Sequence, residues 1–242
     1  PHRLTRRMVG SVGWVWRTVA EADLGPGAGP AAVGAAANRL IGFALQFGPF
    51  AVAQLRLIAE FQELMGIGDD RMGALPALKL FITDTLGNPY VEDEWLPQVA
   101  QPIARSRREA NTIKKSQPIT VVIGNPPYKE KAEGRGGWIE RGSEGRAAPL
   151  DWWRPPRDWG VGAHTKHLKN LYVYFWRWAA WKVFGTGHHD ATGEPARDEE
   201  GIVCFITVAG FLNGPGFQKM RADLRASSRS PRTGLLYTSP SP

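Results

Sequence analysis

Short apolar runs alternate with longer segments of helical period, and this alternation constrains the fold more than any other feature. Four runs have the length and the β-branched and aromatic content typical of buried strands. These are residues 40–46 (LIGFALQ), 77–86 (ALKLFITDTL), 119–124 (ITVVIG) and 202–212 (IVCFITVAGFL). Segments of helical character lie between and after them, at residues 49–66, 104–116, 167–185 and 216–225. Strands that alternate with helices form parallel sheets covered by helices, so we expect an α/β fold with a mostly parallel sheet.

Two of these helices have apolar side chains at a spacing that predicts a buried face. In the first they are Phe50, Val52, Leu55, Leu57, Ile58, Phe61 and Leu64, with Pro49 at the start and Gly66 after the end. In the second they are Leu168, Leu171, Tyr172, Phe175, Trp178 and Ala179. The second helix also carries Arg177 and Lys182, which allow an alternative as a stacking surface for nucleic acid. Its period favours a core helix packed on the sheet.

Composition limits the compartment and the partner. The 242 residues carry 30 Lys and Arg against 23 Asp and Glu, a net charge of +7, which suits either a polyanionic partner or a solubilising surface. Cys204 is the single cysteine and lies in an apolar run, so the simplest expectation is a buried thiol in a reducing, cytoplasmic compartment. No apolar run approaches the length of a membrane span, and no membrane partner is expected.

The third apolar run leads directly into Gly124, Asn125, Pro126, Pro127 and Tyr128. In parallel sheets, ligands bind beyond the carboxyl ends of the strands, which is where these residues are expected. The prolines fix φ and lack amide hydrogens, so the carbonyl groups nearby are available as acceptors. An asparagine carbonyl together with a backbone carbonyl can accept both hydrogens of an exocyclic amino group, while the tyrosine offers a face for stacking.

This arrangement suits methylation of an amine that is conjugated with a ring. Two acceptors that hold the amine hydrogens favour the geometry in which its lone pair can attack a methyl sulfonium, so orientation and electrostatics replace a strong base. The structural alternative is a turn that closes a strand, because Asn-Pro is a common turn former. The preceding strand and Gly124, which allows close backbone approach, favour amine methylation.

The motif and its surroundings resemble the adenine-specific methyltransferase part of type ISP restriction-modification enzymes. NPPY after an apolar strand matches the catalytic motif of the amino-methyltransferases. The likeness covers roughly residues 24 to 225 and rests on RLIGFALQFGPFAVAQLRL, FITDTLGNPY, ITVVIGNPPYKEKAEGRGGW, NLYVYFWRWAAWKVF and GIVCFITVAGFLNGPGFQKMR. It implies a partial class I, Rossmann-like methyltransferase fold with S-adenosylmethionine as donor and a flipped adenine of double-stranded DNA as acceptor. It also implies a longer parent polypeptide with nuclease, helicase and target-recognition parts.

Carried onto this chain, the resemblance gives roles to particular residues. Asn125 and Pro126 would hold the N6 amino group, Pro127 completes the rigid motif, and Tyr128 would stack on the base. Asp84, with Thr85 beside it, matches the acidic position near the adenine ring of the cofactor.

Two departures concern the cofactor. Family members usually have an acidic residue for the cofactor ribose at the position that corresponds to Ala44. The Gly-rich loop for the methionine end should come one strand earlier than GPGAGP, so we expect it upstream of Pro1. We therefore predict a partial methyltransferase domain over residues 1–225, and we expect this fragment by itself to be inactive. Residues 226–242 are expected to be a disordered tail or translated sequencing adaptor, since Leu235 to Ser239 can be back-translated to an adaptor sequence.

The function expected is site-specific DNA N6-adenine methylation in a restriction-modification system. A second possibility is an amino-methyltransferase that acts on a protein glutamine or on RNA, since the same acceptor geometry suits any conjugated amine. A third is a non-catalytic DNA-binding remnant, which Ala44 and the missing loop favour. The remnant would bind DNA in a salt-sensitive way, without dependence on S-adenosylmethionine.

The long interval at 129–166 follows directly on the motif and is expected to be functional or a surface loop. Lys129 and Lys131 are the best candidates for DNA phosphate contacts because they adjoin the proposed base pocket. The interval also carries Trp152, Trp153 and Trp159, which could stack on bases or pack on the domain. No metal site is expected. The spacing of His188, His189 and Asp190 is wrong for one, and His164 and His167 lack a cysteine or carboxylate companion.

Overall fold

The computed structural model describes residue 25 and residues 28–68, 75–91, 101–185 and 201–226. The chain divides into two compact units. The first contains Pro1–Thr85 and Asp93–Ala110, and the second contains Leu86–Glu92 and Asn111–Pro242. We describe each unit by itself, and the prediction of one partial domain over residues 1–225 stays a prediction.

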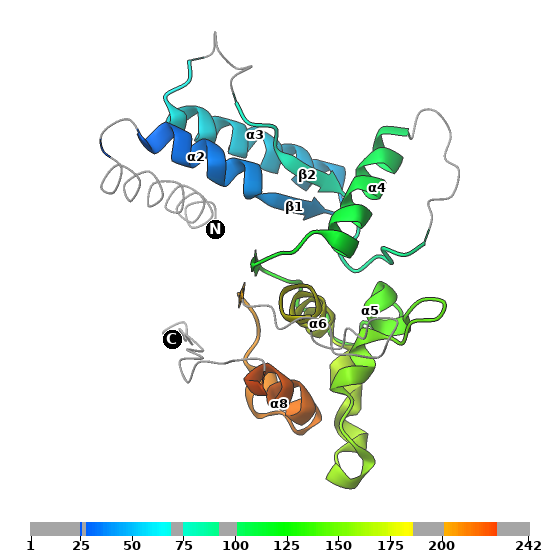
Figure 1. Cartoon of the computed structure of the whole chain (residues 1–242). Coiled ribbons are helices and arrows are strands. Elements are labelled where there is room, and N and C mark those ends of the chain that lie inside the picture. Colours follow the sequence, from blue (N-terminus) through cyan, green and yellow to red (C-terminus); the bar gives the residue numbers. More distant parts are fainter. Residues whose placement is uncertain (1–24, 26–27, 69–74, 92–100, 186–200, 227–242) are drawn as a thin grey trace. The chain divides into compact units, whose positions relative to one another are not determined.

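Among its described residues, the first unit has two parallel strands and two helices packed together, and it also contains the first part, up to Ala110, of a helix that begins at Gln101 (Figure 1). Its elements are α2 (Ala28–Arg39), β1 (Ile41–Ala44), α3 (Phe47–Met65) and β2 (Lys79–Ile82). Ile41 lies opposite Lys79, and Ala44 lies opposite Ile82. The core of this unit is the cluster of Val33, Ala37, Phe61 and Leu64, with Leu57, Met65, Leu75 and Leu78 packed against it.

Helix α3 ends as the sequence predicts and buries a narrower face than expected. Gly66 adopts the left-handed conformation with φ of 64°, and the Ile67 N–H donates to the Gln62 carbonyl, which closes the last turn. Val52 and Leu55, predicted to be buried, are 55% and 68% exposed. The 3.6-residue period places them on the opposite side of the helix from Phe61 and the α2 contact, so the prediction was wrong for these two residues.

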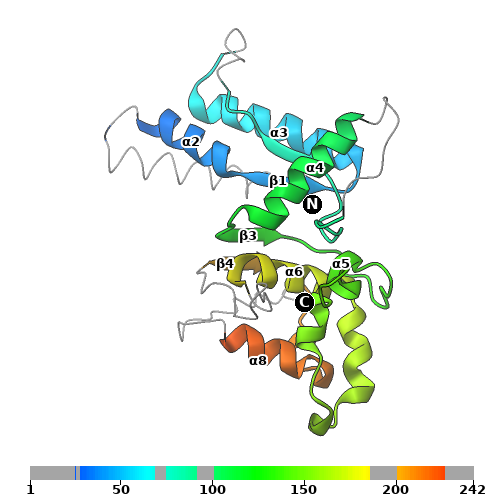
Figure 2. The ribbon, with the colours of Figure 1, turned by 45° about the vertical axis from the view of Figure 1, so that its right-hand side comes forward.

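The second unit is built on the parallel pair of β3 (Val121–Gly124) and β4 (Ile202–Phe205), in which Val121 lies opposite Ile202 and Gly124 opposite Phe205. Helix α6 (Leu171–Phe184) connects the two strands in the chain and lies beside β4, whereas α8 (Gln218–Ala226) lies farther from the strands (Figure 2). Trp176 of α6 meets the ring of Phe205 edge to face at 5.0 Å between centroids. The described residues thus form an α/β structure with parallel strand pairs, as predicted.

One face of the β3–β4 pair is apolar and open. Val121, Ile123, Ile202 and Ile206 are between 49% and 62% exposed, while the alternate residues turn toward α6. Cys204 lies on this open face and is exposed, so the prediction of a buried thiol was wrong. The continuous apolar run predicts a strand that is buried on both faces. Side chains alternate between the two faces of a strand, and Cys204 lies on the exposed one.

Helix α6 is the core of the second unit, as its period predicts. Ten of its residues are buried, including Arg177 and Lys182. The Lys182 ammonium donates to the carbonyls of Ile113 and Lys114 at 3.0 and 2.8 Å, at the C-terminal end of α4 (Gln101–Ser116). A cation at that end satisfies helix carbonyls and complements the helix dipole. Within the described residues, no helix combines the length and the apolar character needed to cross a membrane.

The interval at 129–166 is structured. It contains α5 (Gly137–Arg141), η3 (Pro149–Trp153) and η4 (Arg157–Trp159), and it runs into η5 (Gly162–Lys169). Trp153 is fully buried, and the buried Arg177 Nε donates to the Pro149 carbonyl at 2.6 Å. Burial lowers the pKa of Arg177 to about 9, against the opposing effect of Asp223. Among the tryptophans of the interval that were considered for stacking, Trp153 therefore packs in the core, while Trp152 and Trp159 are 42% and 41% exposed.

Two short helical elements follow β4. Helix α7 spans Gly210–Asn213 and η6 spans Pro215–Phe217. Arg221 of α8 donates to the carbonyls of Phe211 and Gly214, so the chain after β4 folds back on α8. The apolar run at 202–212 therefore holds a strand only as far as Phe205.

Candidate functional site

Asn125 to Tyr128 follow β3 directly, at the carboxyl end of the strand pair, where ligands bind in parallel sheets. The Ile206 N–H donates to the Gly124 carbonyl at 3.1 Å and extends the pairing by one residue. A β-carbon on Gly124 would lie 3.1 Å from the Phe205 ring, closer than most such contacts. Because Gly124 has no side chain, the end of β3 can pack closely against Phe205 of β4, and this contact fixes the point at which the motif begins.

The Tyr128 hydroxyl joins the motif to the end of β4. It lies 2.7 Å from Asn125 Oδ1 and 3.2 Å from the Ile206 carbonyl oxygen. A hydroxyl group has one proton, so it can donate to only one of these acceptors at a time. The shorter distance assigns the donated proton to Asn125. The contact with Ile206 spans 78 residues of sequence and places the tyrosine ring over the chain that leaves β4.

The motif is open to solvent except at its second residue. Asn125 and Pro127 are exposed, Pro126 is buried, and Tyr128 is 45% exposed. Among the described residues, none donates a hydrogen bond to the Pro126 carbonyl oxygen. Asn125 and Pro126 each carry a carbonyl group close to the half-exposed Tyr128 ring, and the prediction that these groups hold an amine stays a prediction.

The segment after Tyr128 is fixed against the N-terminal end of α6. The Leu171 N–H donates to the Lys129 carbonyl at 2.8 Å, and the Lys131 N–H donates to Asn170 Oδ1 at 3.2 Å. Lys131 has a φ of 48°, which is unusual for a residue with a side chain and marks a tight reversal. Both lysine residues are exposed, next to the motif.

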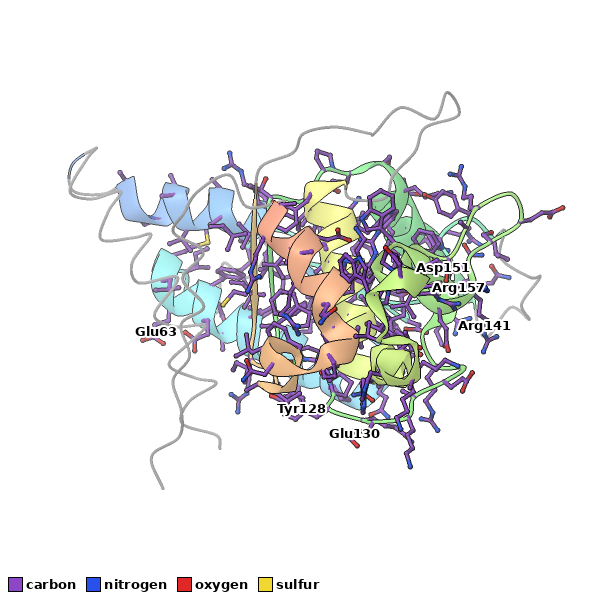
Figure 3. The ribbon with its side chains drawn as sticks, turned by 90° about the horizontal axis from the view of Figure 1, so that it is seen from below. Glu63, Tyr128, Glu130, Arg141, Asp151 and Arg157 are labelled. Carbon is purple, nitrogen blue, oxygen red and sulfur yellow. The ribbon has the colours of Figure 1, made fainter. Side chains whose placement is uncertain are left out.

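Other charged residues of the interval lie elsewhere on the second unit. Figure 3 shows Tyr128 and Glu130 together, apart from Arg141, Asp151 and Arg157. Two cavities of this unit also avoid the motif. One of about 320 Å³ is lined by Glu133, Gly134, Glu140, Arg141, Leu150, Arg154 and Lys169. Another of about 670 Å³ is lined by Asn88, Tyr90, Val91, Ser143, Glu144 and Arg146. We call Asn125 to Tyr128, of which all but Pro126 are exposed, the ledge.

The residues expected near the cofactor lie at the carboxyl ends of β1 and β2 in the first unit. Asp84 is exposed and follows β2 by two residues, with Thr85 half-buried beside it. Ala44 ends β1, and its carbonyl accepts the Thr83 N–H at 2.9 Å. A carboxylate and a methyl group thus lie at neighbouring strand ends. Asn125 to Lys131 are brought together in one unit, while Asp84 and Thr85 belong to the other.

Sequence reasoning missed Ile206, Thr207 and Asn170. The Ile206 carbonyl contacts Tyr128, and the Thr207 hydroxyl is buried without a hydrogen-bond partner among the described residues. The meeting of strand ends in a parallel sheet could have pointed to residues 206 and 207. Asn170 directly precedes a helix, a position that asparagine favours, and its side chain binds the loop after the motif.

The two groups of histidines that were considered as metal ligands lie in different parts of the chain. His164 and His167 have nearly parallel rings with centroids 6.4 Å apart, on η5. In the described part of the chain, no group of three or more His, Cys, Asp or Glu residues is placed to hold a metal ion. His188, His189 and Asp190 lie outside the described residues, as does the tail at 227–242.

A scan against protein-family models, a search of curated proteins and a search of solved structures each found no match to this chain.

Proposed function

We propose that this chain is part of a class I, Rossmann-like DNA methyltransferase that transfers a methyl group from S-adenosylmethionine to N6 of a flipped adenine. The observation that carries the proposal is the ledge at the end of β3. There the carboxamide of Asn125 and the carbonyl of the buried Pro126, to which no described residue donates a hydrogen bond, adjoin a tyrosine that is 45% exposed. A nucleobase suits this set of groups, because its amino group needs two acceptors and its ring can stack on an aromatic side chain.

The residues of the ledge would act on the amine by orientation. Asn125 Oδ1 and the Pro126 carbonyl would accept its two hydrogens, which raises the electron density on the nitrogen and localises there the lone pair that is otherwise shared with the ring. Stacking on Tyr128 would hold the base. The amine held in this way would present its nitrogen to a methyl donor, and the proton that it loses on methylation would pass to water.

The described residues fit the donor only in part. The Asp84 carboxylate can accept a hydrogen bond from an amino group, such as that of the cofactor adenine, but the Ala44 methyl group cannot bind ribose hydroxyls. S-adenosylmethionine would supply the methyl group when bound.

Charge supports DNA as the partner. The chain has a net charge of +7, and Lys129 and Lys131 are exposed on the segment that follows Tyr128. Cations beside a base pocket suit the phosphates that flank a flipped nucleotide. We place the activity in the cytoplasm, in a longer parent polypeptide that also carries nuclease, helicase and target-recognition parts.

The test is adenine-dependent binding. A fluorescent duplex with one adenine opposite an abasic site is compared with the same duplex carrying hypoxanthine, whose oxygen replaces the amino group. We expect the adenine duplex to bind about tenfold more tightly, the worth of one or two good hydrogen bonds. Asn125→Ala should remove this preference, and Asn88→Ala, in a similar sequence, should keep it. Equal affinity for both duplexes in the unaltered chain would refute the proposal.

A second candidate function is a DNA-binding remnant without catalysis, which Ala44 at the end of β1 favours. The remnant would bind both duplexes equally, with strong salt dependence and no effect of added S-adenosylmethionine. RNA of the same sequence and a glutamine-containing peptide serve as competitors in the same assay. If either competitor displaced the labelled duplex at a lower concentration than unlabelled DNA does, the methyl acceptor would be RNA or a protein glutamine instead of DNA.

A further inference from the structure

The cavity of about 670 Å³ in the second unit contains two hydrogen-bond donors that no described residue accepts. All of its lining residues belong to this unit, and none belongs to the ledge. They are Asn88, Tyr90, Val91, Ser143, Glu144 and Arg146. The volume is in the range of small-molecule sites, which are concave and carry a few convergent polar groups. The two donors are the Ser143 hydroxyl and the Arg146 guanidinium.

The Ser143 hydroxyl keeps its proton because of the way Asn88 is held. The Tyr90 backbone N–H donates to Asn88 Oδ1 at 2.9 Å, which fixes the carboxamide with its NH₂ group on the other side. That NH₂ group donates to Ser143 Oγ at 2.9 Å, so the serine oxygen is the acceptor in this contact. A hydroxyl that accepts still has one proton to donate, and no described residue accepts it.

The Arg146 guanidinium is held in place by a ring instead of a carboxylate. Its Cζ atom lies 4.2 Å from the centroid of the Tyr90 ring, a distance typical of a cation–π contact. Within the described part of the chain, no carboxylate forms an ion pair with Arg146. The contact with the ring restrains the side chain, and N–H donors of the guanidinium stay available to a ligand.

A tight turn brings these two donors together. The Ser143 N–H donates to the Arg146 carbonyl at 3.0 Å, and the Arg146 N–H donates to the Ser143 carbonyl at 2.9 Å. Residues that are paired in this way across an antiparallel bridge have their side chains on the same face. Gly145, with φ of 70°, allows the chain to reverse between them. The turn therefore places a hydroxyl donor and a cationic donor at one cavity.

We propose that this cavity binds the oxyanion of a small molecule, a phosphate or a carboxylate group. The planar guanidinium matches two oxygens of such a group, and the Ser143 hydroxyl can donate to the same group. Val91, which is 57% exposed, offers apolar surface to the rest of the ligand. Glu144 also lines the cavity, and its negative charge weakens the attraction for an anion. We choose a small molecule over duplex DNA because the donors line a concave site.

The experiment uses the full chain and three probes with the same ring, which are phenyl phosphate, benzoate and phenol. Isothermal titration calorimetry gives the three dissociation constants. Phenol lacks the oxyanion, so we expect it to bind at least about tenfold more weakly than the tighter of the other two, the worth of one hydrogen bond to a charged group. The tighter of the two anions identifies the group as a phosphate or a carboxylate. If phenol binds as tightly as both anions, the proposal is wrong.

Variants test the two donors and the opposing charge. Ser143→Ala and Arg146→Gln should each weaken binding of the tighter anion about tenfold, because each removes a donor to a charged group. Glu144→Gln should tighten it about threefold, since a like charge is gone. Arg157→Gln is the matched control, because Arg157 is exposed in the same unit, outside this cavity, and the change in net charge is the same. Equal losses in Arg157→Gln and Arg146→Gln would show general charge attraction and overturn the proposal.

Nitrogen-15 NMR shows where the anion binds. The Arg146 Nε–H signal, identified by its absence in Arg146→Gln, should shift on addition of the tighter anion, and the Arg157 signal should not. If the anion binds and the Arg146 signal does not move, the cavity is not the site and the proposal is wrong.

A DNA duplex distinguishes the two sources of an oxyanion. We expect it to leave the small anion bound and to bind Arg146→Gln as tightly as the unaltered chain. If the duplex displaces the anion, and Arg146→Gln weakens duplex binding, the oxyanion is a DNA phosphate and the proposal of a small molecule is wrong. Neither result bears on the amine site, which rests on Asn125 and Pro126.

Discussion

The second unit contains two segments of nearly the same sequence, GNPY at 87–90 and GNPPY at 124–128, and they have different surroundings. In the first, the Asn88 carboxamide is satisfied at both ends, Pro89 is buried, and the Tyr90 ring is covered. In the second, Asn125 is exposed, and within the described residues its side chain is hydrogen-bonded by the Tyr128 hydroxyl alone. The same residue types therefore occur twice: Asn88 and Tyr90 are held by several contacts beside the cavity of about 670 Å³, whereas Asn125 is exposed and Tyr128 is 45% exposed.

The difference arises from what surrounds each tyrosine. The Tyr90 ring meets Trp138 edge to face at 5.5 Å, Trp138 meets Trp181 at 4.8 Å, and the Arg146 guanidinium lies 4.2 Å from the Tyr90 ring centroid. Tyr128 has instead a free ring face at the end of a parallel strand pair. We therefore regard an Asn-Pro-Tyr segment as a candidate site where its asparagine is exposed at the end of a strand. We regard it as a structural turn where aromatic side chains pack against its tyrosine.

The largest effect that would sharpen this comparison concerns Trp138, which is 4% exposed and packs between Tyr90 and Trp181. Trp138→Ala should lower the free energy of unfolding by about 3–5 kcal/mol through the cavity it leaves. Tyr128→Ala, at an exposed ring, should cost under about 1 kcal/mol. Urea denaturation followed by circular dichroism measures both. Similar losses for the two variants would show that the GNPPY segment is as structural as GNPY.

A smaller effect separates the two asparagines. Asn88→Ala should lower the free energy of unfolding by about 1–2 kcal/mol, because it removes the partners of the Tyr90 N–H and the Ser143 hydroxyl. Asn125→Ala should change it by no more than about 0.5 kcal/mol, since its side chain is exposed. The same denaturation series measures both. If Asn125→Ala were the more damaging, the ledge would be part of the scaffold.

The sequence predicted the positions of the elements better than their surroundings. Each strand of the structure lies inside an apolar run that was predicted, and α3 ends at Gly66 as expected. Periodicity shows which residues share a face, but whether another element covers that face depends on packing across the chain. The open positions of Cys204 and Leu55 could not be foreseen for this reason.

The same limit applies to the candidate site. The residue types of NPPY imply two acceptors and a ring, and their place after a strand implies the carboxyl end of a sheet. The hydroxyl contact to the Ile206 carbonyl joins residues 78 positions apart, and no local pattern indicates it. The burial of GNPY likewise depends on Trp138 and Arg146, both more than 45 residues away in sequence.

Alkaline titration tests the burial of the first segment. Burial raises the pKa of Tyr90 above its ordinary value of 10.0, although Arg146 opposes this. A phenol whose pKa is higher in the folded state stabilises the fold fully below its unfolded pKa, and that stability is lost as the pH rises through the folded pKa. We therefore expect the free energy of unfolding to fall above pH 10, and to fall less steeply in Tyr90→Phe. Tyrosinate absorbance gives the titration, and an unchanged slope in Tyr90→Phe would mean that the ring is not buried.

The smallest effect concerns the cations beside each tyrosine. Lys129 is exposed next to Tyr128, so Lys129→Ala should weaken duplex binding and reduce the slope of log K against log salt by about 0.9, the loss of one phosphate contact. Arg146 lies over the Tyr90 ring, and Arg146→Ala should instead lower the free energy of unfolding by about 0.5–1 kcal/mol without changing the salt slope. Fluorescence anisotropy at several salt concentrations measures the slopes. If Arg146→Ala changed the slope and Lys129→Ala did not, DNA would bind near the GNPY segment, and the functional assignment of the two segments would be reversed.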